Sequence, residues 1–310
     1  MTQNKYHTPV LLKDCIEGLK IQPEGIYVDV TYGGGGHSKE ILKQLTTGRL
    51  IAFDQDDDAL NNKVEDERLI LLKQNFRFLK NNLRLNNAVP VDGILADLGV
   101  SSHQFDEAER GFSTRFDANL DMRMDQHLRL TAKEVLNNYE EDQLRKLFME
   151  YGELENSAKL ARTICTQRKS KTIETGNDLK AIAKAFTRWG KENQYYAQLF
   201  QALRIEVNKE LDALKELLIQ ALDVLKPGGR LVVISYHSLE DRLVKNFMRS
   251  GKMEGDAEKD FYGNSLAPFK LITRKPIIPQ EMEMEQNSRA RSAKLRIAEK
   301  LANSQLASSE

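Results

Sequence analysis

The sequence predicts an α/β protein whose mostly parallel sheet is interrupted by an all-helical insertion. Up to residue 104, short apolar segments alternate with helical ones, a pattern typical of βαβ units with helices on both faces of a sheet. Between residues 105 and 204 we find no convincing buried strand, and the alternation then returns. We therefore expect one discontinuous domain, residues 1–104 and 205–310, with residues 105–204 inserted into it as a helical domain.

The first segment contains four expected strands. Each is a short apolar run, and two of them end at an aspartate, Asp54 and Asp97. The strands are expected at residues 26–30, 50–54, 69–72 and 93–97. Helices are expected at residues 38–45 and from about residue 57. Thr8-Pro9 should open an earlier helix that runs to about residue 19, because proline suits the first helical position.

The insertion and the second segment have clear start and stop signals. Thr131 and Glu134 form a capping box that opens a helix, and further helices are expected near residues 141–151, 158–168 and 178–189. A leucine stripe over residues 211–225 predicts a helix, which the Pro-Gly-Gly at residues 227–229 stops before a fifth strand at residues 231–236. Two short alternating segments, residues 269–275 and 293–299, could pair as an antiparallel edge hairpin.

The composition excludes several classes of protein. Lys plus Arg equals Asp plus Glu at 46 each, so bulk charge does not indicate a polyanionic partner and only local clusters can. No apolar run approaches the roughly 20 residues of a membrane helix, and the N-terminus lacks a signal-peptide apolar region. The two cysteines, Cys15 and Cys165, have no metal-ligand or redox spacing. We expect a cytoplasmic protein with no defensible metal cluster.

A run of four glycines, Gly33 to Gly36, follows the first strand and precedes a helix. Glycines in this place let the backbone approach a ligand closely, and the helix N-terminus offers free N–H groups. The third glycine of the dinucleotide pattern G-x-G-x-x-G is missing, because His37 and Ser38 follow, and the sequence of a phosphate-binding loop is also absent. A tight turn is the alternative, but it needs fewer glycines. The run favours a nucleotide-like ligand that the dinucleotide pattern fits poorly.

Asp54 ends the second strand, where a carboxylate can accept both hydroxyls of a ribose. Its alternative role is to cap the helix that follows. The approach to the fifth strand distinguishes between ligands, because Leu225 to Leu231 closely resembles the corresponding turn of class I methyltransferases. The glycine run, Asp54 and this turn together predict a class I (Rossmann-like) methyltransferase sheet that binds S-adenosyl-L-methionine.

Asp97 ends the fourth strand, at the edge where open α/β sheets place their reacting groups. Amino-group methyltransferases place hydrogen-bond acceptors there for the target amine, and transfer from a sulfonium needs mainly in-line proximity. Asp97 is therefore a candidate catalytic residue that orients an amine, or a contact of the cofactor's own amino group. The alternative is a cap at the end of a strand.

Several long and unusual motifs carry a family resemblance. They are residues 7–12, 32–38, 92–102, 109–113, 120–125, 204–208, 235–242 and 289–293. In these motifs the chain resembles the ribosomal RNA small subunit methyltransferase H family over nearly its whole length. The resemblance implies S-adenosyl-L-methionine-dependent methylation of the N4 amine of cytidine 1402 in 16S rRNA, with the small ribosomal subunit as partner.

The resemblance also implies which residues contact the cofactor. These are Gly34, Gly35, Gly36, His37, Asp54, Phe76, Asp97 and Gln104. Phe76 would stack on or cover the adenine, and Gln104 would close the pocket beyond the fourth strand; otherwise they are a core aromatic and a surface polar residue. The chain departs from the family at His103, Asn119 and Ser288, where proline is expected, and this puts the rigidity of the loop at His103 in doubt.

Residues 157–191 form a basic stretch inside the insertion. Nine Lys or Arg residues stand against two acids, which gives a local charge of +7. Three aromatic residues lie at its end, Trp189, Tyr195 and Tyr196. Basic residues near aromatics suit an RNA backbone and stacked bases, and Arg168 and Lys169 are the first candidates for RNA contacts. The alternative is a solvated helix surface with core aromatics.

Five further residues are candidates for contacts with the RNA substrate. They are Ser101, His237, Ser238, Arg289 and Arg291. His237 and Ser238 end the fifth strand on the expected rim of the pocket, although a lone histidine is more often structural. A paired base would have to leave its stack to reach the methyl group, and the sequence does not indicate how this happens.

Two other functions stay open at this stage. A DNA amino-methyltransferase would use the same cofactor, but the fourth strand lacks the Pro-Pro-aromatic signature of that group. An RNA-binding ribosome assembly factor with a vestigial cofactor site is the non-catalytic alternative, against which Asp54, Asp97 and the glycines argue. The target nucleotide comes from the resemblance alone. The oligomeric state and the form of the RNA substrate, naked or assembled, are open.

Overall fold

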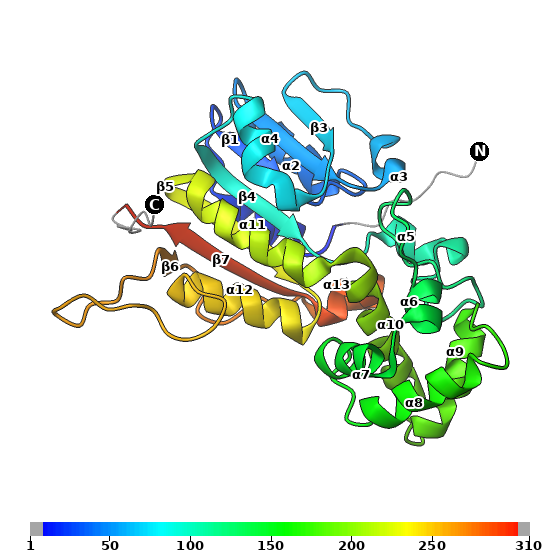
Figure 1. The fold of residues 1–310 in the computed structure, drawn as a ribbon. Helices are drawn as coiled ribbons and strands as arrows, with labels where there is room; N and C mark the ends of the chain where they lie inside the picture. Colours follow the sequence, from blue (N-terminus) through cyan, green and yellow to red (C-terminus); the bar gives the residue numbers. More distant parts are fainter. Residues whose placement is uncertain (1–8, 303–310) are drawn as a thin grey trace. The chain divides into compact units, whose positions relative to one another are not determined.

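The computed structural model describes residues 9–302, whose course from β1 to β7 is drawn in Figure 1. Two compact units are present: a sheet unit, Met1–Gly99 with Leu211–Glu310, and an insertion unit, Val100–Glu210. The sequence places the boundaries at 104/105 and 204/205 instead. The second boundary differs because helix α10 (Glu192–Asn208) runs past residue 204 before Lys209 adopts a left-handed φ of 51°.

A seven-stranded sheet forms the centre of the sheet unit. Its strands are β1 (Ile26–Asp29), β2 (Arg49–Asp54), β3 (Leu69–Lys73), β4 (Val91–Asp97), β5 (Leu225–Ser235), β6 (Phe269–Leu271) and β7 (Lys294–Lys300). They follow the order β3-β2-β1-β4-β5-β7-β6, in which β1 to β5 pair in parallel and β7 pairs antiparallel with β5 and β6. The predicted α/β class and class I (Rossmann-like) sheet are confirmed, and so is the antiparallel pairing of the last two strands.

The direction in which strands are added reverses between β1 and β4. From β1 the chain proceeds outward through β2 and β3, and then returns to place β4 on the other side of β1. Loops that leave such a switch point in opposite directions open a crevice at the carboxyl ends of the strands. Asp29, Asp54 and Asp97 are the last residues of β1, β2 and β4. The topology therefore collects three carboxylates at one edge of the sheet.

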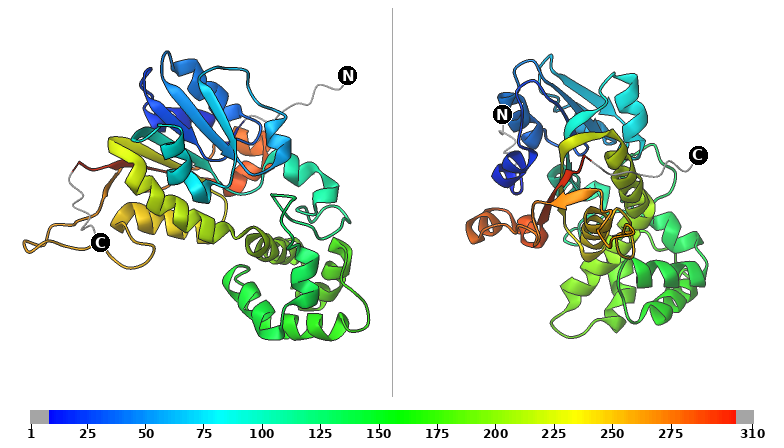
Figure 2. Two further views of the ribbon diagram at one scale, coloured as in Figure 1. Left: turned by 45° about the horizontal axis from the view of Figure 1, so that its top comes forward. Right: turned by 90° about the vertical axis from the view of Figure 1, so that its left-hand side faces the viewer.

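Helices cover both faces of this sheet, as two further views show (Figure 2). The helices of the sheet unit are α1 (Leu12–Leu19), α2 (Gly36–Gln44), α3 (Asp57–Leu60), α4 (Leu79–Leu85), α11 (Glu210–Val224), α12 (Ser238–Ser250) and α13 (Glu281–Gln286), with short 3-10 helices η1 (Phe76–Phe78) and η4 (Ser288–Ser292). Leu83, Leu218 and Phe247 of α4, α11 and α12 are buried in one core, and Cys15 and Ile41 of α1 and α2 in the other. Successive strand residues alternate between the two cores, as the pleat requires.

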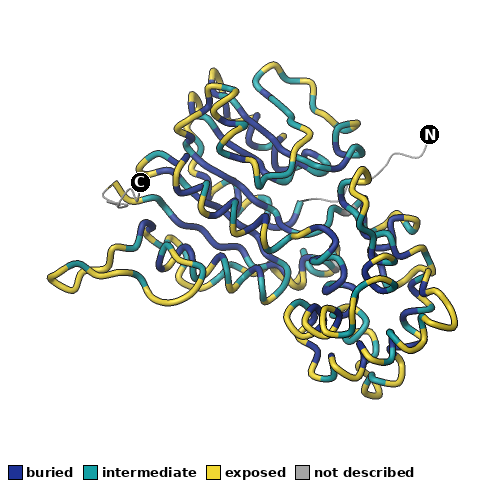
Figure 3. Tube along the Cα trace, in the orientation of Figure 1, coloured by how far each residue is buried: buried dark blue, intermediate teal, exposed yellow. Residues whose placement is uncertain are grey.

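All regular elements that the structure describes in the insertion unit are helices. They are α5 (Ser102–Asp106), η2 (Ala108–Arg110), α6 (Ala132–Asn138), α7 (Glu141–Glu150), α8 (Ser157–Gln167), α9 (Gly176–Ala183), η3 (Lys184–Phe186) and α10. Thr131 caps α6 and Glu134 completes the predicted capping box. Buried Asn208 accepts from the Met124 N–H at 2.7 Å and donates to the Met122 carbonyl at 2.8 Å, which ties the end of α10 to the loop before α6. Buried helical faces and exposed connections alternate along this unit (Figure 3).

Three expected helices differ from the structure. α1 begins at Leu12 rather than at Pro9, because Leu11 adopts a left-handed φ of 52° and its N–H donates to Glu283 Oε1 at 2.7 Å; Thr8 lies outside the described residues. The polar helix expected from residue 57 is the single turn α3. The helix expected over residues 178–189 ends earlier, because α9 gives way to η3 and then to a turn in which Gly190 has a φ of 74°.

Candidate cofactor and substrate site

The glycine run connects β1 to α2 at the switch point. Gly33 and Gly35 have left-handed φ values of 52° and 72°, which residues with a Cβ rarely adopt. At Gly36 the constraint is space, because a Cβ there would collide with the ring of Pro9. The first residue of α2 is Gly36, so its N-terminal N–H groups face away from the helix at this edge of the sheet. The run is therefore required by conformation at two positions and by close packing at a third.

Asp54 ties the end of β2 to this glycine run. Its Oδ2 accepts from the Gly33 N–H at 2.8 Å, and its Oδ1 accepts from the Asp56 N–H at 2.9 Å. Burial raises the pKa of Asp54 to about 6, although the two backbone N–H groups work in the opposite direction. Asp56, and not Asp54, caps α3. The helix-capping alternative for Asp54 is therefore wrong, and its carboxylate is held in one orientation beside the glycines.

Asp29 organises the layer beneath the loop, and the sequence analysis did not select it. Its buried carboxylate accepts from the Ser38 hydroxyl at 2.7 Å and from the Thr31 N–H at 3.1 Å. Thr31 in turn accepts from the Asp97 N–H at 2.7 Å through its hydroxyl, which links β1 to the end of β4. Burial raises the pKa of Asp29, against the influence of His37. An acidic residue within an apolar strand is the signal that would have identified it.

Asp97 lies between two ring side chains. The Tyr236 hydroxyl donates to its Oδ1 at 2.7 Å, and Nδ1 of His37 is 3.9 Å from its Oδ2. The other ring nitrogen of His37, Nε2, is 3.2 Å from the Val10 carbonyl, which requires a proton on Nε2. Burial raises the pKa of Asp97, while His37 and Tyr236 lower it. One carboxylate oxygen is thus engaged, and the other faces an imidazole.

Tyr236, which directly follows β5, is the second functional candidate that the sequence analysis missed. Burial raises the pKa of its hydroxyl well above the ordinary value, and the neighbouring Asp97 adds to this effect. The hydroxyl therefore keeps its proton and acts as a donor to Asp97. Its position after a strand of the same sheet was the available signal, because the carboxyl ends of β4 and β5 lie side by side.

Phe76 follows β3 and opens the 3-10 helix η1. Asn75 caps this helix by accepting from the Arg77 N–H at 2.9 Å, and its side-chain amide donates to Gln55 Oε1 at 2.7 Å. Phe76 is partly buried against the core formed by α4, α11 and the sheet. The link from Asn75 to Gln55 connects the segment of Phe76 to the residue after Asp54. The ring of Phe76 is therefore fixed by its neighbours at the β2–β3 side of the edge.

His237 has a structural role at the start of α12. Its Nδ1 accepts from the Glu240 N–H at 3.5 Å, and Glu240 Oε2 accepts from the His237 N–H at 3.4 Å, which completes a capping box. Nε2 of His237 is 3.2 Å from the other oxygen of Glu240. Ser238 is the first residue of this helix. A substrate contact by His237 or Ser238 stays a prediction, and the cap is the role that the geometry gives to His237.

Four other residues predicted to contact the cofactor or the RNA lie at α5 and η4. Ser101 and Gln104 belong to the insertion unit, where they form the capping box of α5, with the Gln104 N–H 3.1 Å from Ser101 Oγ and the Ser101 N–H 3.0 Å from Gln104 Oε1. Arg289 and exposed Arg291 lie on η4. The structure thus gathers the glycine run, His37, Asp54, Phe76 and Asp97 on one unit, and describes Gln104 and Ser101 within the other.

His103, Asn119 and Ser288 stand at the three positions where proline is expected. His103 lies in α5, and its carbonyl accepts from the Glu107 N–H at 3.0 Å. Asn119 forms an isolated β-bridge with Thr175. Ser288 begins η4. None of these positions removes a side chain that the site uses.

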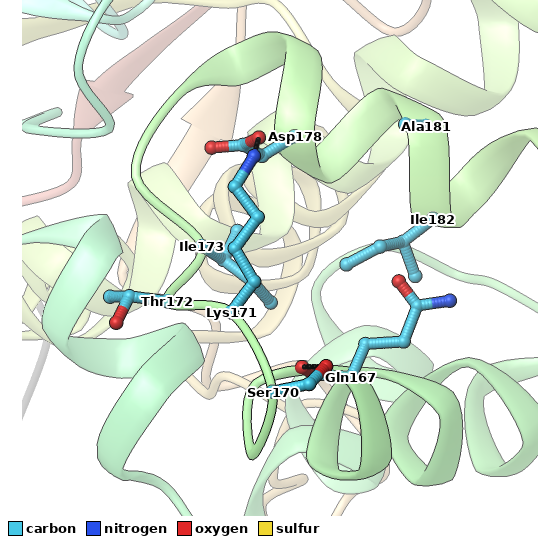
Figure 4. A pocket seen from close by; sticks show the side chains of 8 residues that line it. All are labelled: Gln167, Ser170, Lys171, Thr172, Ile173, Asp178, Ala181 and Ile182. Carbon is cyan, nitrogen blue, oxygen red and sulfur yellow. Dashed lines mark hydrogen bonds and ion pairs between the residues drawn. The ribbon is translucent and has the colours of Figure 1, made fainter.

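The basic stretch of the insertion divides into engaged and exposed cations. Arg168 donates to the carbonyls of Leu136 and Tyr139, at 2.8 and 2.7 Å, so it holds the end of α6. Lys171 forms an ion pair of 2.6 Å with Asp178 beside a small pocket of about 220 Å³ between α8 and α9 (Figure 4). The exposed lysines without an ion pair among the described residues include Lys159, Lys169, Lys184 and Lys191. Lys169 is therefore a better candidate for an RNA phosphate than Arg168.

The chain is similar to known proteins over nearly its whole length. A model of the MraW methylase family matches residues 4–301. Three similar proteins are each named ribosomal RNA small subunit methyltransferase H: that of Christiangramia forsetii is 60% identical over 96% of this chain and 98% of its own, that of Flavobacterium johnsoniae 58% over 97% and 99%, and that of Bacteroides thetaiotaomicron 55% over 95% and 97%.

Two further findings concern a similar solved structure and the length and polarity of the helices. A structure described as an rRNA methylase from Streptococcus thermophilus is 14% identical to this chain, with a TM-score of 0.41 over 94% of this chain and 93% of that one. Within residues 9–302, every helix is too short or too polar to cross a membrane.

Proposed function

The chain belongs to the MraW methylase family, and on this premise we propose that it transfers a methyl group from S-adenosyl-L-methionine to the N4 amine of a cytidine, position 1402, in 16S rRNA. The methyltransferase class follows from the family. The rRNA substrate is supported by the names of relatives that are 55% to 60% identical. The nucleotide and its N4 atom rest on the motifs that the sequence shares with that family. A substrate in the small ribosomal subunit implies action in the cytoplasm.

The observation that carries the proposal is the convergence of Asp54, the glycine run and Asp97 at one switch point. Each carboxylate ends a strand; that of Asp54 accepts from the Gly33 N–H, and that of Asp97 accepts from the Tyr236 hydroxyl. A nucleoside cofactor with a charged amino acid part needs these donors and acceptors in one crevice. This chemistry fits S-adenosyl-L-methionine.

The residues that would hold the cofactor are those on the β1–β2–β3 side. Asp54 keeps lone pairs for the ribose hydroxyls, the loop at Gly34 to Gly36 offers backbone close to the ligand, and Phe76 supplies an apolar surface for the adenine. When bound, the cofactor would supply an electrophilic methyl group on a sulfonium, and an in-line amine would take this methyl group as its carbon–sulfur bond breaks and the neutral thioether leaves. Gln104 would contribute from the insertion unit.

Asp97 would act on the target amine. Oδ1 of Asp97 is occupied by the Tyr236 hydroxyl, which leaves Oδ2 to accept a hydrogen bond from the amine and to take up the proton that the amine loses. Nδ1 of His37 is 3.9 Å from Oδ2, where a positive charge on the ring would stabilise the ionised carboxylate. Tyr236 positions Asp97 without touching the substrate. The three side chains together orient an amine and hold its proton.

The test is to map the methylated base. Wild-type and Asp97→Ala proteins are incubated with labelled S-adenosyl-L-methionine and with small subunits from cells that lack the enzyme. We expect label on the N4 atom of one cytidine with the wild type and almost none with Asp97→Ala. Label on another atom, or no label at all from the wild type, contradicts the proposal.

A further inference from the structure

Trp189 is the chain's single tryptophan, and its side chain is almost wholly in solvent, with 98% exposure. The two tyrosines that follow it differ, because Tyr195 and Tyr196 are partly buried against the core of the insertion unit and Tyr195 donates to Asn156 at 2.8 Å. Of the three aromatics at the end of the basic stretch, Trp189 alone presents both ring faces. An indole has the largest stacking surface among side chains, and burial of that surface would be favourable.

A short turn fixes the position of this indole. The Lys191 N–H donates to the Arg188 carbonyl at 2.9 Å, and Gly190 has a φ of 74°, the arrangement of a type II turn with Trp189 at its second position. The turn is anchored before and after. Phe186 packs against the core and its carbonyl accepts from Asn156 Nδ2 at 3.2 Å, while Lys191 is the N-cap residue of α10. The indole is therefore presented by a fixed backbone and not by a free loop.

Cations flank the turn on both sides. Residues 184–191 carry three basic residues, Lys184, Arg188 and Lys191, and no acid. Arg188 approaches Glu155 at 3.3 Å, but both side chains are exposed, so this ion pair is weak and a phosphate can replace the carboxylate. Lys184 and Lys191 are exposed and have no carboxylate partner among residues 9–302. A ring with cations on either side matches a base with its two neighbouring phosphates.

We propose that the turn Arg188–Trp189–Gly190–Lys191 is a stacking site for an unpaired RNA base, with the indole on the base and Arg188 and Lys191 on the adjacent phosphates. The inference deepens the proposed function and rests on it for the RNA substrate. Base–aromatic stacking tolerates any base sequence, because every base has a π face. The turn therefore holds a single-stranded segment and does not select the target cytidine.

A second pair of exposed aromatic residues, Phe261 and Tyr262, shows that the surrounding charge decides which ligand an exposed ring can bind. Phe261 and Tyr262 are 96% and 86% exposed in the connection between α12 and β6, but residues 254–260 before them hold four acids and one lysine. Phosphates would be repelled there. Exposure of an aromatic ring is thus common to both tips, and only the tip at Trp189 adds the positive charge that RNA requires. Phe261 is a matched control for this reason.

The first experiment uses the fluorescence of the single tryptophan. The full-length protein is titrated with a short single-stranded RNA that cannot pair with itself, and with the same sequence as a blunt duplex. We expect saturable quenching by the single strand and much weaker quenching by the duplex. Unchanged emission at RNA concentrations where the anisotropy of labelled RNA reports complete binding overturns the proposal.

The second experiment compares variants by the anisotropy of labelled single-stranded RNA. Trp189→Ala should weaken binding roughly tenfold or more, the range expected for one stacked base, and Trp189→Phe should restore most of the loss. Phe261→Ala should leave the affinity within about twofold. Equal losses in Trp189→Ala and Phe261→Ala, or no loss in Trp189→Ala, contradict the stacking site. Affinity for S-adenosyl-L-methionine and the melting temperature should not change in any of the three variants.

Methyl transfer to small subunits, measured on the same preparations, separates the two proposals. Stacking without methyl transfer by the wild type leaves the RNA site standing and removes the proposed function. If RNA does not quench the indole and Trp189→Ala does not affect methyl transfer, the proposed function stands and the stacking site is removed. An acidic protein that quenches the indole more strongly than RNA does would assign the turn to a protein partner and overturn the RNA assignment.

Discussion

The strand ends of the sheet unit and the turn at Trp189 use polar groups in opposite ways. At the strand ends, Asp29, Asp54 and Asp97 are held by hydrogen bonds of 2.7 to 3.1 Å from neighbouring loops, and burial raises the pKa of each. At the turn, charged groups are exposed and their partners are replaceable. The first region is built for one geometry, and the second for a flexible polyanion.

This difference predicts how each region responds to amino-acid substitution. In the buried network the polar atoms are linked to one another, so removal of a single atom leaves another group misplaced or unsatisfied and costs the chemical step heavily. On the exposed surface each cation contributes a modest, salt-dependent share of the binding. Substitutions at the strand ends should therefore act through cofactor binding and kcat, and substitutions on the insertion through RNA affinity.

The most severe test replaces Asp97 by asparagine. The amide keeps the size of the side chain but cannot take up a proton from the target amine. We expect kcat to fall by roughly 10²- to 10⁴-fold, the range for loss of a proton acceptor. Single-turnover methyl transfer to small subunits at saturating S-adenosyl-L-methionine measures the effect.

The matched control is Asp92→Asn on the same strand. Asp92 lies near the other end of β4, where its Oδ2 accepts from the Ile26 N–H at 2.8 Å and its Oδ1 forms an ion pair with Lys226. Its substitution should lower stability by about 1 kcal/mol and leave kcat nearly unchanged. If kcat falls equally in Asp92→Asn and Asp97→Asn, the carboxyl end of β4 has no special role in the chemical step.

The next test removes the hydroxyl that positions Asp97. The hydrogen bond from Tyr236 stabilises the ionised carboxylate, so Tyr236→Phe should raise the pKa of Asp97. The acid limb of the kcat profile should then move to higher pH, so that kcat falls on that limb while the plateau at higher pH is retained. Profiles of kcat against pH for the two proteins measure both changes.

Tyr27→Phe is the control for this substitution. Tyr27 is also a tyrosine of the sheet unit and is buried, but its hydroxyl accepts from the Gln22 N–H at 2.7 Å, away from Asp97. A purely structural effect of losing a buried hydroxyl should appear in both variants as a lower melting temperature. The pH limb should move in Tyr236→Phe alone, and an unmoved limb there would remove Tyr236 from the mechanism.

A smaller effect should appear in the pH dependence of cofactor binding. The carboxylate of Asp54 accepts ribose hydroxyls only when it is ionised, and its pKa is about 6. Affinity for S-adenosyl-L-methionine should therefore be constant above pH 7 and should fall up to tenfold for each unit below pH 6. Calorimetry from pH 5 to 8 measures this, and Asp54→Asn should bind weakly with no such dependence. Complete absence of binding by the wild type would instead favour an assembly factor with a vestigial site.

The sequence predicted the two regions unequally. The strands, the glycine run, Asp54 and Asp97 were predicted because apolar runs that end in an acidic residue are local signals. Asp29 was missed because the expected strand runs one residue past it, to residue 30, whereas β1 ends at Asp29. Tyr236 was missed because its role depends on β4 and β5 lying side by side, which is not local information. On the insertion, the sequence indicated the charge but not its distribution. The carbonyl partners of Arg168 and the exposure of Trp189 appear only once the helices pack.

The smallest expected effect concerns a single exposed cation. Lys169 is exposed and has no ion pair among the described residues, so Lys169→Glu should weaken RNA binding only a few-fold and should reduce the salt dependence of log Kd by about 0.7 for one lost phosphate contact on a single strand. Arg168→Glu is a poor test of RNA binding, because it also removes two hydrogen bonds to the end of α6 and should lower the melting temperature. Titrations with single-stranded RNA at several salt concentrations distinguish the two variants. An unchanged salt slope in Lys169→Glu would restrict the RNA surface to the turn at Trp189 and sharpen the contrast between the buried network at the strand ends and one small exposed site.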